Sequence, residues 1–211
     1  NLDLMTRPEF PFALIGLVHI GNTIDLRRPL DLADRFDLTA RVEHLRAHER
    51  GRAVDVVTTA TVDGDVVWQE RSSYLHRTRP APAAPGPRPA AAAPDDAADR
   101  PAAHWVVPAN IGRAYASVSG DRNPIHTSTI AARLFGFPAR IAHGMWAKAR
   151  CLAALAGRLP EAYTVDVAFK APILLGATVA YWTEEFGPER RFGLYQPGSG
   201  RPHLLGSVTP D

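Results

Sequence analysis

A proline- and alanine-rich stretch near the middle of the chain most constrains what it can fold into. Residues 78–103, TRPAPAAPGPRPAAAAPDDAADRPAA, consist almost entirely of Pro, Ala, Asp and Arg. No period in this stretch would bury one face of a helix or strand. We interpret it as a linker, which at about 3.1 Å per residue can reach from one end of a domain to the other. The chain is therefore predicted to have a first half, residues 1–77, and a second half, residues 104–211.

The composition of the 211 residues predicts a globular protein with a packed core. Hydrophobic residues make up 45% of the chain, and no apolar run approaches the roughly 18 residues that cross a bilayer. A net charge of +2 without a cluster of Lys and Arg does not favour nucleic acid as a partner. The single cysteine, Cys151, excludes an intramolecular disulfide and favours a reducing compartment. We therefore expect a cytoplasmic protein with no nucleic-acid or membrane partner.

The first half is predicted to be mostly β-strand. The segment FDLTARVEHLRAHERG, from Phe36, alternates apolar and polar residues, and RAVDVVTTATVDGDVVWQERSSYLH, from Arg52, has two β-branched runs. Asp63 and Gly64 separate these runs, which predicts a hairpin with a tight turn. Only NLDLMT has helical character. Because the chain starts at Asn1 rather than Met, we expect the N-terminal half to be truncated.

The second half is predicted to combine helices with an antiparallel sheet. NPIHTSTIAARLFG predicts one short helix, with Asn123 as N-cap, Pro124 at the first helical position and Gly136 at its end. HGMWAKARCLAALAG predicts a helix from about Met145 to Ala156. The segments YTVDVAFKAPI, ATVAYWTEEF, RFGLYQ and HLLGSVT predict strands. A sheet built from them can wrap around the preceding helix.

Asp121 and His126 lie on either side of an Asn-Pro step in SGDRNPIH, residues 119–126. The step turns the chain into a helix, so the two side chains can converge on one point. A helix N-terminus disfavours a cationic imidazole, and a neutral imidazole beside a carboxylate can hold and deprotonate a water. The alternative is an Asx turn made by Asp121 and a surface position for His126. The residue types alone favour this alternative.

Gly144, in IAHGM, comes directly before the second predicted helix. Its backbone N–H would lie at the positive end of that helix, where an oxygen that gains negative charge can bind. The alternative is a glycine that only a tight turn requires, with His143 capping the helix or packing beside it.

The stretch YASVSGDRNPIHTSTIAA, residues 115–132, resembles the signature of the MaoC-like (R)-specific enoyl-CoA hydratases, also called hydratase 2. That signature has an aromatic residue, a short spacer, SGD, any residue, NP, an aliphatic residue, His and a later small residue. Its positions are matched by Tyr115, Ser119, Gly120, Asp121, Asn123, Pro124, Ile125, His126 and Ala132. The following GFPARIAHGM resembles the next block of the family. The chain is also similar to actinobacterial 3-hydroxyacyl-thioester dehydratases, in FPFALIGLVHIGNTI among other segments.

The resemblance implies an α+β double hotdog, in which each half is an antiparallel sheet wrapped around a central helix. It implies a catalytic MaoC-like hotdog in residues 104–211 and a non-catalytic half, residues 1–77, that lines the acyl pocket. The implied reaction is the reversible syn hydration of trans-2-enoyl thioesters to (3R)-3-hydroxyacyl thioesters in fatty-acid metabolism. Asp121 and His126 would activate the water, and the N–H of Gly144 would stabilise the enolate oxygen. The resemblance gives supporting roles to Tyr115, Ser119, Gly120, Asn123, Pro124 and His143.

The implied reaction requires no metal and no redox cofactor. Its substrate is an acyl thioester of CoA or of an acyl carrier protein, and a homodimer is left open. Leu152 stands where some family members carry a serine near the active site. Five basic residues near the motif are candidates to meet phosphates, although surface charge explains each of them better: Arg122, Arg140, Lys148, Arg150 and Lys170.

Two other functions stay open on the sequence alone, because hotdog folds do not settle function. One is an acyl-CoA thioesterase, and the other is a non-catalytic acyl-thioester-binding or subunit-pairing module. A covalent nucleophile has little support, since there is no G-x-S-x-G elbow and Cys151 lies in a predicted helix without an activating partner. His44 and His48 have the spacing of a helical metal pair, but on a predicted strand they would lie about 13 Å apart.

Overall fold

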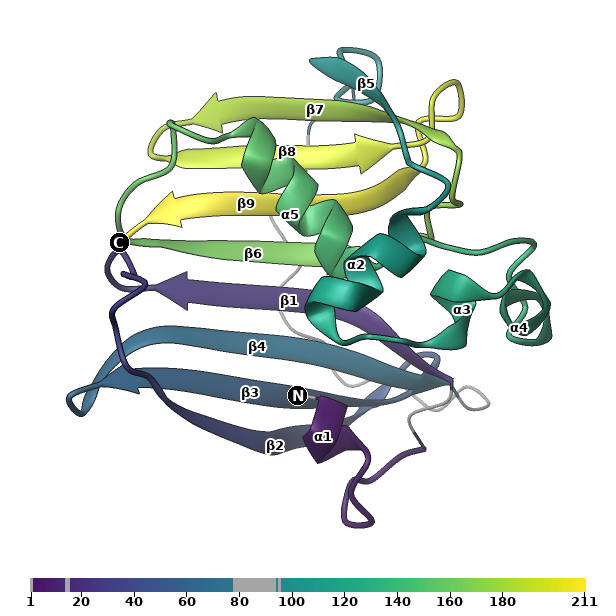
Figure 1. Cartoon of the computed structure of the whole chain (residues 1–211). Coiled ribbons are helices and arrows are strands. Elements are labelled where there is room, and N and C mark those ends of the chain that lie inside the picture. The colour runs from purple at the N-terminus through teal and green to yellow at the C-terminus, as the bar shows by residue number, and fades with distance from the viewer. Residues whose placement is uncertain (1, 14–15, 78–93, 95) are drawn as a thin grey trace. The chain divides into compact units, whose positions relative to one another are not determined.

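The computed structural model describes residues 2–13, 16–77, 94 and 96–211 (Figure 1). The predicted linker lies largely outside the described residues. The chain divides into two compact units. The first unit comprises Asn1–Ala90, Arg158–Ala168 and Ser207–Asp211, and the second comprises Ala91–Gly157 and Phe169–Gly206. Each unit therefore combines segments that are separated in the sequence.

The first unit is built on antiparallel strands. Its described strands are β1 (Leu17–Leu26), β2 (Asp37–His48), β3 (Gly51–Val62), β4 (Asp65–Arg77), most of β6 (Tyr163–Phe169) and the end of β9 (Pro202–Pro210). They are ordered β2-β3-β4-β1-β6-β9. The one helix described in this unit, α1 (Leu2–Met5), has four residues. Among the described residues, a sheet with a longer central helix is therefore seen in the second unit and not in the first.

The predicted hairpin is confirmed by β3 and β4. Val62 pairs with Asp65, and between them Asp63 and Gly64 have φ values of 52° and 92°. Left-handed conformations at both turn positions match the twist of the flanking strands, and Asp-Gly tolerates them. Strand β1 was not predicted, because its buried Asn22 breaks the apolar pattern. Asn22 Nδ2 donates to Glu70 Oε1 at 2.7 Å, so this polar side chain is satisfied inside the sheet.

A buried carboxylate gathers three basic side chains of the first unit. Asp55 is 4% exposed and accepts a hydrogen bond from Ser73 Oγ at 2.7 Å. Arg46 lies 2.9 Å and Arg71 lies 3.3 Å from its oxygens. His44 Nδ1 is 3.4 Å from the same carboxylate, so the strand bulge at His44 serves an ion-pair network rather than a metal pair with His48.

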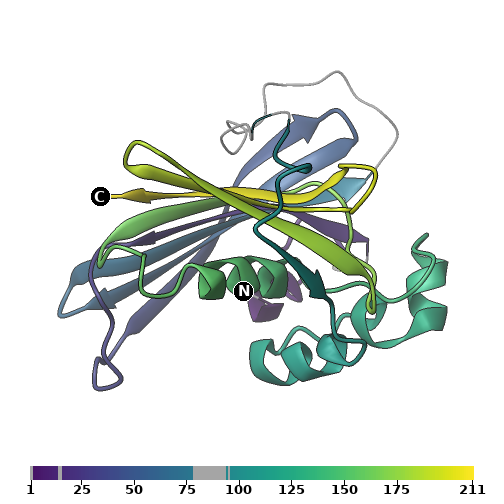
Figure 2. The ribbon, with the colours of Figure 1, turned by 90° about the horizontal axis from the view of Figure 1, so that it is seen from above.

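The second unit places helices against an antiparallel sheet. Its strands are β5 (Ala103–Val106), β7 (Thr178–Phe186), β8 (Glu189–Tyr195) and part of β9 (Pro202–Pro210), ordered β9-β8-β7-β5. Its helices are α2 (Ile111–Ser119), α3 (Pro124–Thr127), α4 (Thr129–Leu134) and α5 (Gly144–Ala154). Figures 1 and 2 show α5 lying against one face of these strands. The predicted α+β class and the strands that follow α5 are confirmed, whereas β5 and α2 were missed.

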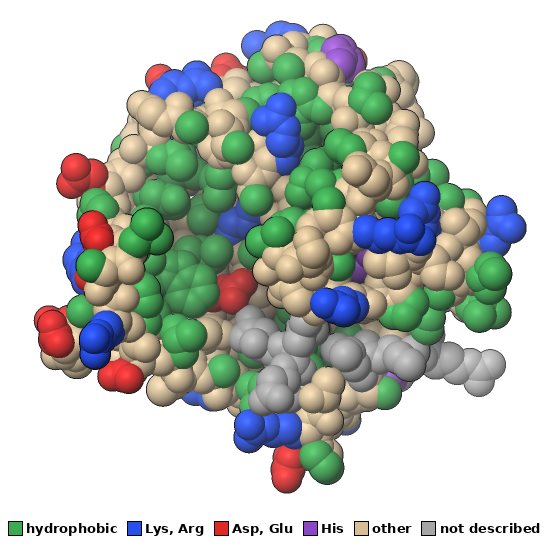
Figure 3. Space-filling model, in the orientation of Figure 1, with side chains coloured by type: hydrophobic (Ala, Val, Ile, Leu, Met, Phe, Trp, Pro, Cys, Tyr) green, Lys and Arg blue, Asp and Glu red, His purple; other side chains and the backbone are tan. Residues whose placement is uncertain are grey.

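The helix predicted in NPIHTSTIAARLFG is in fact two short helices. Ser128 has φ −125° and ψ 124°, which interrupts the helix, and its Oγ accepts the N–H of Ala131 at 3.3 Å. A serine side chain that caps the next helix competes with continuation of the first. Hydrophobic side chains remain at the surface over α4 (Figure 3), where Ile130 is 76% and Leu134 is 81% exposed.

Helix α5 starts one residue earlier than predicted and ends at Ala154. Gly157, three residues further on, has a φ of 77°, in the left-handed region typical of helix ends. Cys151 and Leu155, near its end, are fully buried. None of the described helices has the length and apolar character that crossing a bilayer takes.

Tyr195 buries its phenolic hydroxyl group in the second unit. Its ring packs with Trp182 and Ala97 in one core cluster of the second unit. The hydroxyl oxygen has no hydrogen-bond partner among the described residues, and burial raises the pKa of Tyr195 to about 12. An unpaired buried hydroxyl has lost its hydration without compensation.

Replacing Tyr195 by Phe is therefore expected to leave the free energy of unfolding unchanged or to raise it by up to about 1 kcal/mol. Urea denaturation followed by fluorescence measures this. The matched control is Thr183→Val, which removes a hydrogen bond from Thr183 Oγ1 to the carbonyl of Arg191 at 3.0 Å. That control should cost about 1 kcal/mol. A similar loss in Tyr195→Phe would show that the phenol does have a partner.

Candidate active site

The segment between α2 and α3 is held as a tight corner by its own side chains. Ser119 Oγ donates to the carbonyl of Tyr115 at 2.9 Å and accepts the N–H of Asp121 at 3.2 Å. Asp121 Oδ1 accepts the N–H of Asn123 at 3.1 Å. Asn123 Oδ1 then accepts the N–H of Ile125 at 3.3 Å. Such short-range bonds from Ser, Asp and Asn to the backbone define the corner locally.

Glycine and proline mark the two ends of this corner. Gly120 ends α2 with a φ of 75°, and its N–H donates to the carbonyl of Ala116 at 3.1 Å. Pro124 occupies the start of α3, where its missing N–H costs nothing, and Asn123 is the N-cap. The predicted cap and first helical position are confirmed.

Asp121 makes the predicted Asx turn and also faces two imidazoles. Oδ1 bonds to the N–H of Asn123, while Oδ2 lies 3.9 Å from Nε2 of His143. One ligand atom from each of Asp121, His126 and His143 lies within 4.8 Å of the others. The two interpretations of Asp121 are therefore compatible. The surface position considered for His126 is wrong, because His126 is only 7% exposed.

The ring of His126 is held in one tautomer by a main-chain carbonyl. Nδ1 lies 2.8 Å from the carbonyl oxygen of Ile141. A carbonyl only accepts, so Nδ1 carries the proton and Nε2 keeps a free lone pair. An imidazole fixed in this way is ready to act as a base at Nε2.

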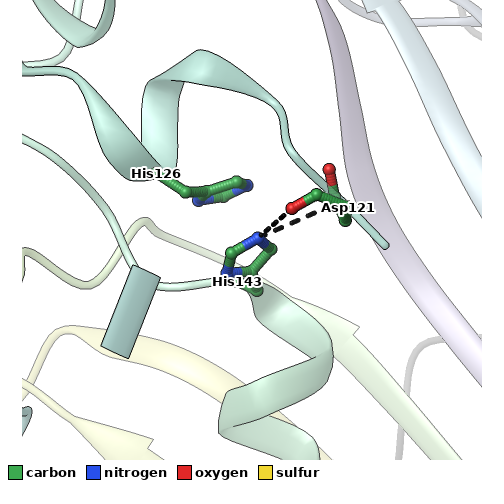
Figure 4. Close-up of side chains that lie close together, drawn as sticks. All are labelled: Asp121, His126 and His143. Atoms are coloured by element: carbon green, nitrogen blue, oxygen red, sulfur yellow. Dashed lines mark hydrogen bonds and ion pairs between the residues drawn. The ribbon is translucent and has the colours of Figure 1, made fainter. Parts of the chain in front are cut away.

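His143 lies face to face with His126 (Figure 4). The ring centres are 3.6 Å apart and the planes differ by 25°. Nε2 of His143 is 3.0 Å from the main-chain oxygen of Asp121, to which it donates. The ring of Tyr115 packs against His143 with centres 5.0 Å apart. His143 thus contacts both members of the Asp121 and His126 pair.

Both imidazoles are neutral at pH 7. Burial lowers the pKa of His126 to about 4, helped by the neighbouring His143 and opposed by the bond to Ile141 and the charge of Asp121. Burial also lowers the pKa of His143. The neutral form of His126 was predicted, but its cause was not. Helix α3 has four residues, and the low pKa comes from burial rather than from a helix N-terminus.

Gly112 allows α2 to approach the backbone of His126 closely. A Cβ atom at residue 112 would lie 2.0 Å from the carbonyl oxygen of His126, far inside contact distance. Only a hydrogen fits between these two backbones. Gly112 was missed in the sequence, although a glycine inside a helix is costly and signals a packing constraint.

Gly144 begins α5 beside an aromatic ring. A Cβ atom at residue 144 would lie 2.9 Å from Cε1 of Phe169, so a side chain there would displace that ring. His143 is the N-cap of the helix but makes no side-chain cap hydrogen bond. Of the two roles considered for His143, packing is the observed one. Because the first turn of α5 has no helical acceptor for its N–H groups, a ligand oxygen can bind there.

Comparison with known proteins places this geometry in a family. Residues 90–196 match the family model described as a MaoC like domain. Over 98% of its length the chain is 39% identical to 3-hydroxyacyl-thioester dehydratase X of Mycobacterium tuberculosis, and it covers 73% of that protein. The chain belongs to the MaoC-like dehydratase family. The family resemblance of the signature from Tyr115 to Ala132 is confirmed.

Solved structures agree with this membership. The crystal structure of HtdX from Mycobacterium tuberculosis matches with a TM-score of 0.85 at 37% identity, over 100% of this chain and 82% of that one. A MaoC-like dehydratase from Phytophthora capsici shares the fold with a TM-score of 0.76 at 18% identity, over 93% of this chain and 72% of that one. The antiparallel sheet with its central helix is the hotdog-like fold of MaoC-like dehydratases.

The site of this MaoC-like chain is poorly arranged for a metal ion, although its three ligand atoms are close enough to share one. The lone pairs of an imidazole lie in the ring plane, and the planes of His126 and His143 differ by only 25° at a separation of 3.6 Å. Their lone pairs run side by side instead of converging on one ion, as tetrahedral coordination would require. The arrangement suits proton transfer better than metal binding.

The basic residues proposed to meet phosphates differ in their surroundings. Lys148 is 2% exposed, so the interpretation as a surface charge is wrong for it. The guanidinium of Arg150 lies 4.2 Å from the ring centre of Trp105 in a cation–π contact. Phosphate binding stays a prediction for Arg122, Arg140, Arg150 and Lys170.

Two residues of α5, Cys151 and Leu152, bear on whether the chain could use a covalent nucleophile and on how its site differs from those of other MaoC-like proteins. Cys151 is fully buried, and burial raises the pKa of its thiol well above the usual range. A thiol in that state is a poor nucleophile. Leu152, where some MaoC-like proteins carry a serine, is partly buried and offers no hydrogen bond.

Replacing Gly112 by Ala is expected to lower Tm. In a helix without close neighbours this change raises stability by about 1 kcal/mol. Here the methyl group must force α2 away from His126, and overpacking of this kind costs about 1–3 kcal/mol. Scanning fluorimetry measures the shift. Ser117→Ala, at an exposed position of the same helix, is the matched control and should leave Tm level or raise it. A rise of Tm in Gly112→Ala would disprove the close approach.

Proposed function

We propose that this chain is a 3-hydroxyacyl-thioester dehydratase, which catalyses the reversible syn addition of water to a trans-2-enoyl thioester. The observation that carries the proposal is the pairing of a buried, neutral His126, free at Nε2, with the carboxylate of Asp121. The name of the 39% identical mycobacterial relative supports it. A base and a second proton-transfer group on one side of a substrate are what syn hydration requires.

Asp121 and His126 together move the protons of the reaction. In hydration they hold one water, whose oxygen bonds to C3 of the enoyl group while one of its protons is taken up. A proton is returned to C2 on the same face, so Asp121 and His126 end in their starting protonation states. In dehydration the same steps run backwards. Which side chain makes each transfer is left open, since acid and base roles exchange with direction.

Gly144 supplies the proposed donor to the thioester oxygen. That oxygen gains negative charge when the C2 carbanion is stabilised as an enolate. The N–H of Gly144, in the first turn of α5, would bind it, and one such donor contributes about 3 kcal/mol to a transition state. Phe169, whose ring would contact any side chain at residue 144, keeps this position open only to glycine.

The remaining residues of the corner have proposed supporting roles. Ser119 and Asn123 fix the backbone of Asp121 through the bonds described above. His143 orients both members of the pair by stacking and by its bond to the main chain, and Tyr115 packs behind it. Gly120 and Pro124 allow the turn itself.

Several finer features belong to the same proposal. The product has the (3R) configuration, and the physiological setting is fatty-acid metabolism. Catalysis belongs to residues 104–211, and residues 1–77 form the non-catalytic half of a double hotdog. The scheme uses no metal ion and no redox cofactor.

The rate should depend on pH through His126. Its imidazole takes part in the proton transfers in its neutral form, and its pKa in the folded protein is about 4, below the usual 6.5. We expect kcat/KM to stay level from pH 7 to about 5 and to fall with a midpoint near 4. The unfolded chain takes up this proton near pH 6.5, so the stabilising contribution of neutral His126 is lost as pH falls from about 6.5 to 4. A kinetic midpoint near 6.5, measured on stably folded protein, would contradict a buried neutral base.

Asp121→Asn and His126→Gln should each lower kcat by about 10²- to 10⁴-fold, because each replaces one proton-transfer group by an amide of similar volume that does not titrate. Crotonyl-CoA is the substrate, and loss of the conjugated enoyl absorbance is the signal. Circular dichroism and Tm check that both variants fold, and Ser117→Ala is the control with normal rates. Near-normal rates in either variant would rule out the assigned pair.

Free thiol, measured in the same reaction, separates the proposal from its alternatives. Loss of the enoyl absorbance without thiol release is the expected result. Thiol release would identify a thioesterase instead. If neither signal changes while crotonyl-CoA binds, the chain is a non-catalytic binding module.

A further inference from the structure

Helix α4 leaves an apolar face uncovered. Ile130 is 76% and Leu134 is 81% exposed, and Phe135, directly after the helix, is 38% exposed. Ile130 and Leu134 are four residues apart, which places them on the same side of the helix. Single exposed apolar residues are ordinary, but adjacent large ones on one face mark an interaction surface.

Arginines without a salt bridge among the described residues lie on α4 and on the stretch of chain before it. Residues 111–140 contain four arginines and a single acid, Asp121, which lies in the site. Arg113, Arg122 and Arg133 are exposed, and none of them forms a salt bridge among the described residues. Arg133 lies on α4 between Ile130 and Leu134, and its Nε donates to the carbonyl of Pro138 at 3.4 Å. Figure 3 shows Lys and Arg side chains beside hydrophobic ones over α2–α4.

The chemistry of this surface favours an acidic protein as its occupant. A second copy of this chain would bring the same arginines to the contact, and like charges repel. The phosphates of CoA would use the arginines but would leave Ile130 and Leu134 in water. An acidic helix with a few apolar residues satisfies both features, because apolar contacts supply affinity and opposite charges supply orientation and a fast association rate.

The position of the surface connects it to catalysis. Helix α4 follows α3 after one residue, and α3 carries His126. The α2–α3 corner carries Asp121. A protein bound over α2–α4 would therefore lie beside the helix that carries His126.

We propose that the exposed face of α4 with Ile130, Leu134 and Arg133, together with the exposed Arg113 and Arg122 on the preceding elements, is the docking surface for an acidic carrier protein. That protein presents the acyl group as a thioester, and the inference rests on the proposed dehydratase function. It names a protein, rather than free CoA, as the preferred carrier of the substrate.

The test compares two carriers of one acyl group. The probes are crotonyl-CoA and a type II acyl carrier protein loaded with a crotonyl group, used with the full chain. Arg133→Glu and Leu134→Ser should each lower kcat/KM for the loaded carrier protein by about tenfold, and leave kcat/KM for crotonyl-CoA within about twofold. Arg52→Glu, on β3 of the first unit, is the matched control and should change neither value. Rising ionic strength should weaken the carrier-protein reaction more than the CoA reaction.

Binding provides a readout that does not depend on turnover. Fluorescence anisotropy of the labelled, loaded carrier protein should give a Kd about tenfold higher for Arg133→Glu than for the wild-type chain. An unchanged Kd, or an equal loss with both carriers, overturns the docking surface. Self-association of the wild-type chain that Leu134→Ser abolishes would also overturn it, in favour of a second copy. Binding of the carrier protein without turnover of either substrate would leave the docking surface standing and would reject the dehydratase function.

Discussion

One buried imidazole that is held neutral organises the candidate site of the second unit. His126 is enclosed by the ring of His143 on one side and bonded through Nδ1 to the carbonyl of Ile141. A charge at this depth would be costly, so the folded protein holds the neutral form and one tautomer. The short segment from Ile141 to His143 supplies both contacts. It is itself anchored by a bond from the N–H of Ala142 to the carbonyl of Ile173 at 2.8 Å. Proton chemistry at Nε2 therefore depends on where this segment is placed.

The candidate site also requires that α2 and α5 approach their neighbours closely. Gly112 lets α2 meet the carbonyl of His126, and Gly144 lets the start of α5 meet the ring of Phe169. Both glycines act through the absence of a side chain, and the two helices come close to the pair from different directions. The corner between α2 and α3 then needs only local bonds, from Ser119, Asp121 and Asn123, to direct the carboxylate toward the imidazoles.

Hotdog-like folds serve several activities, so the fold alone does not choose among them. The proposal of water addition rests on the Asp121 and His126 pair, and the Cys151 thiol, buried with a raised pKa, is a poor nucleophile. The exposed apolar and basic face of α4 is the surface on which we propose that a carrier protein docks to deliver the substrate. His126 lies on α3 and the exposed apolar face lies on α4, which follows directly. One short segment of sequence therefore carries both the proposed proton transfer and the proposed recognition of the carrier protein.

Local interactions were predictable from the sequence, and long-range ones were not. The hairpin at Asp63-Gly64, the cap at Asn123 and the family signature depend on residues close together in the chain. The interruption at Ser128 is also local, but its side chain favoured a new cap over a longer helix. Strand β1 escaped prediction because Asn22 is satisfied by Glu70, 48 residues away in the sequence. The sequence by itself determined the corner that carries Asp121 and His126. Only the tertiary structure decided that His126 is buried and neutral, because burial and the carbonyl of Ile141 come from segments that meet on folding.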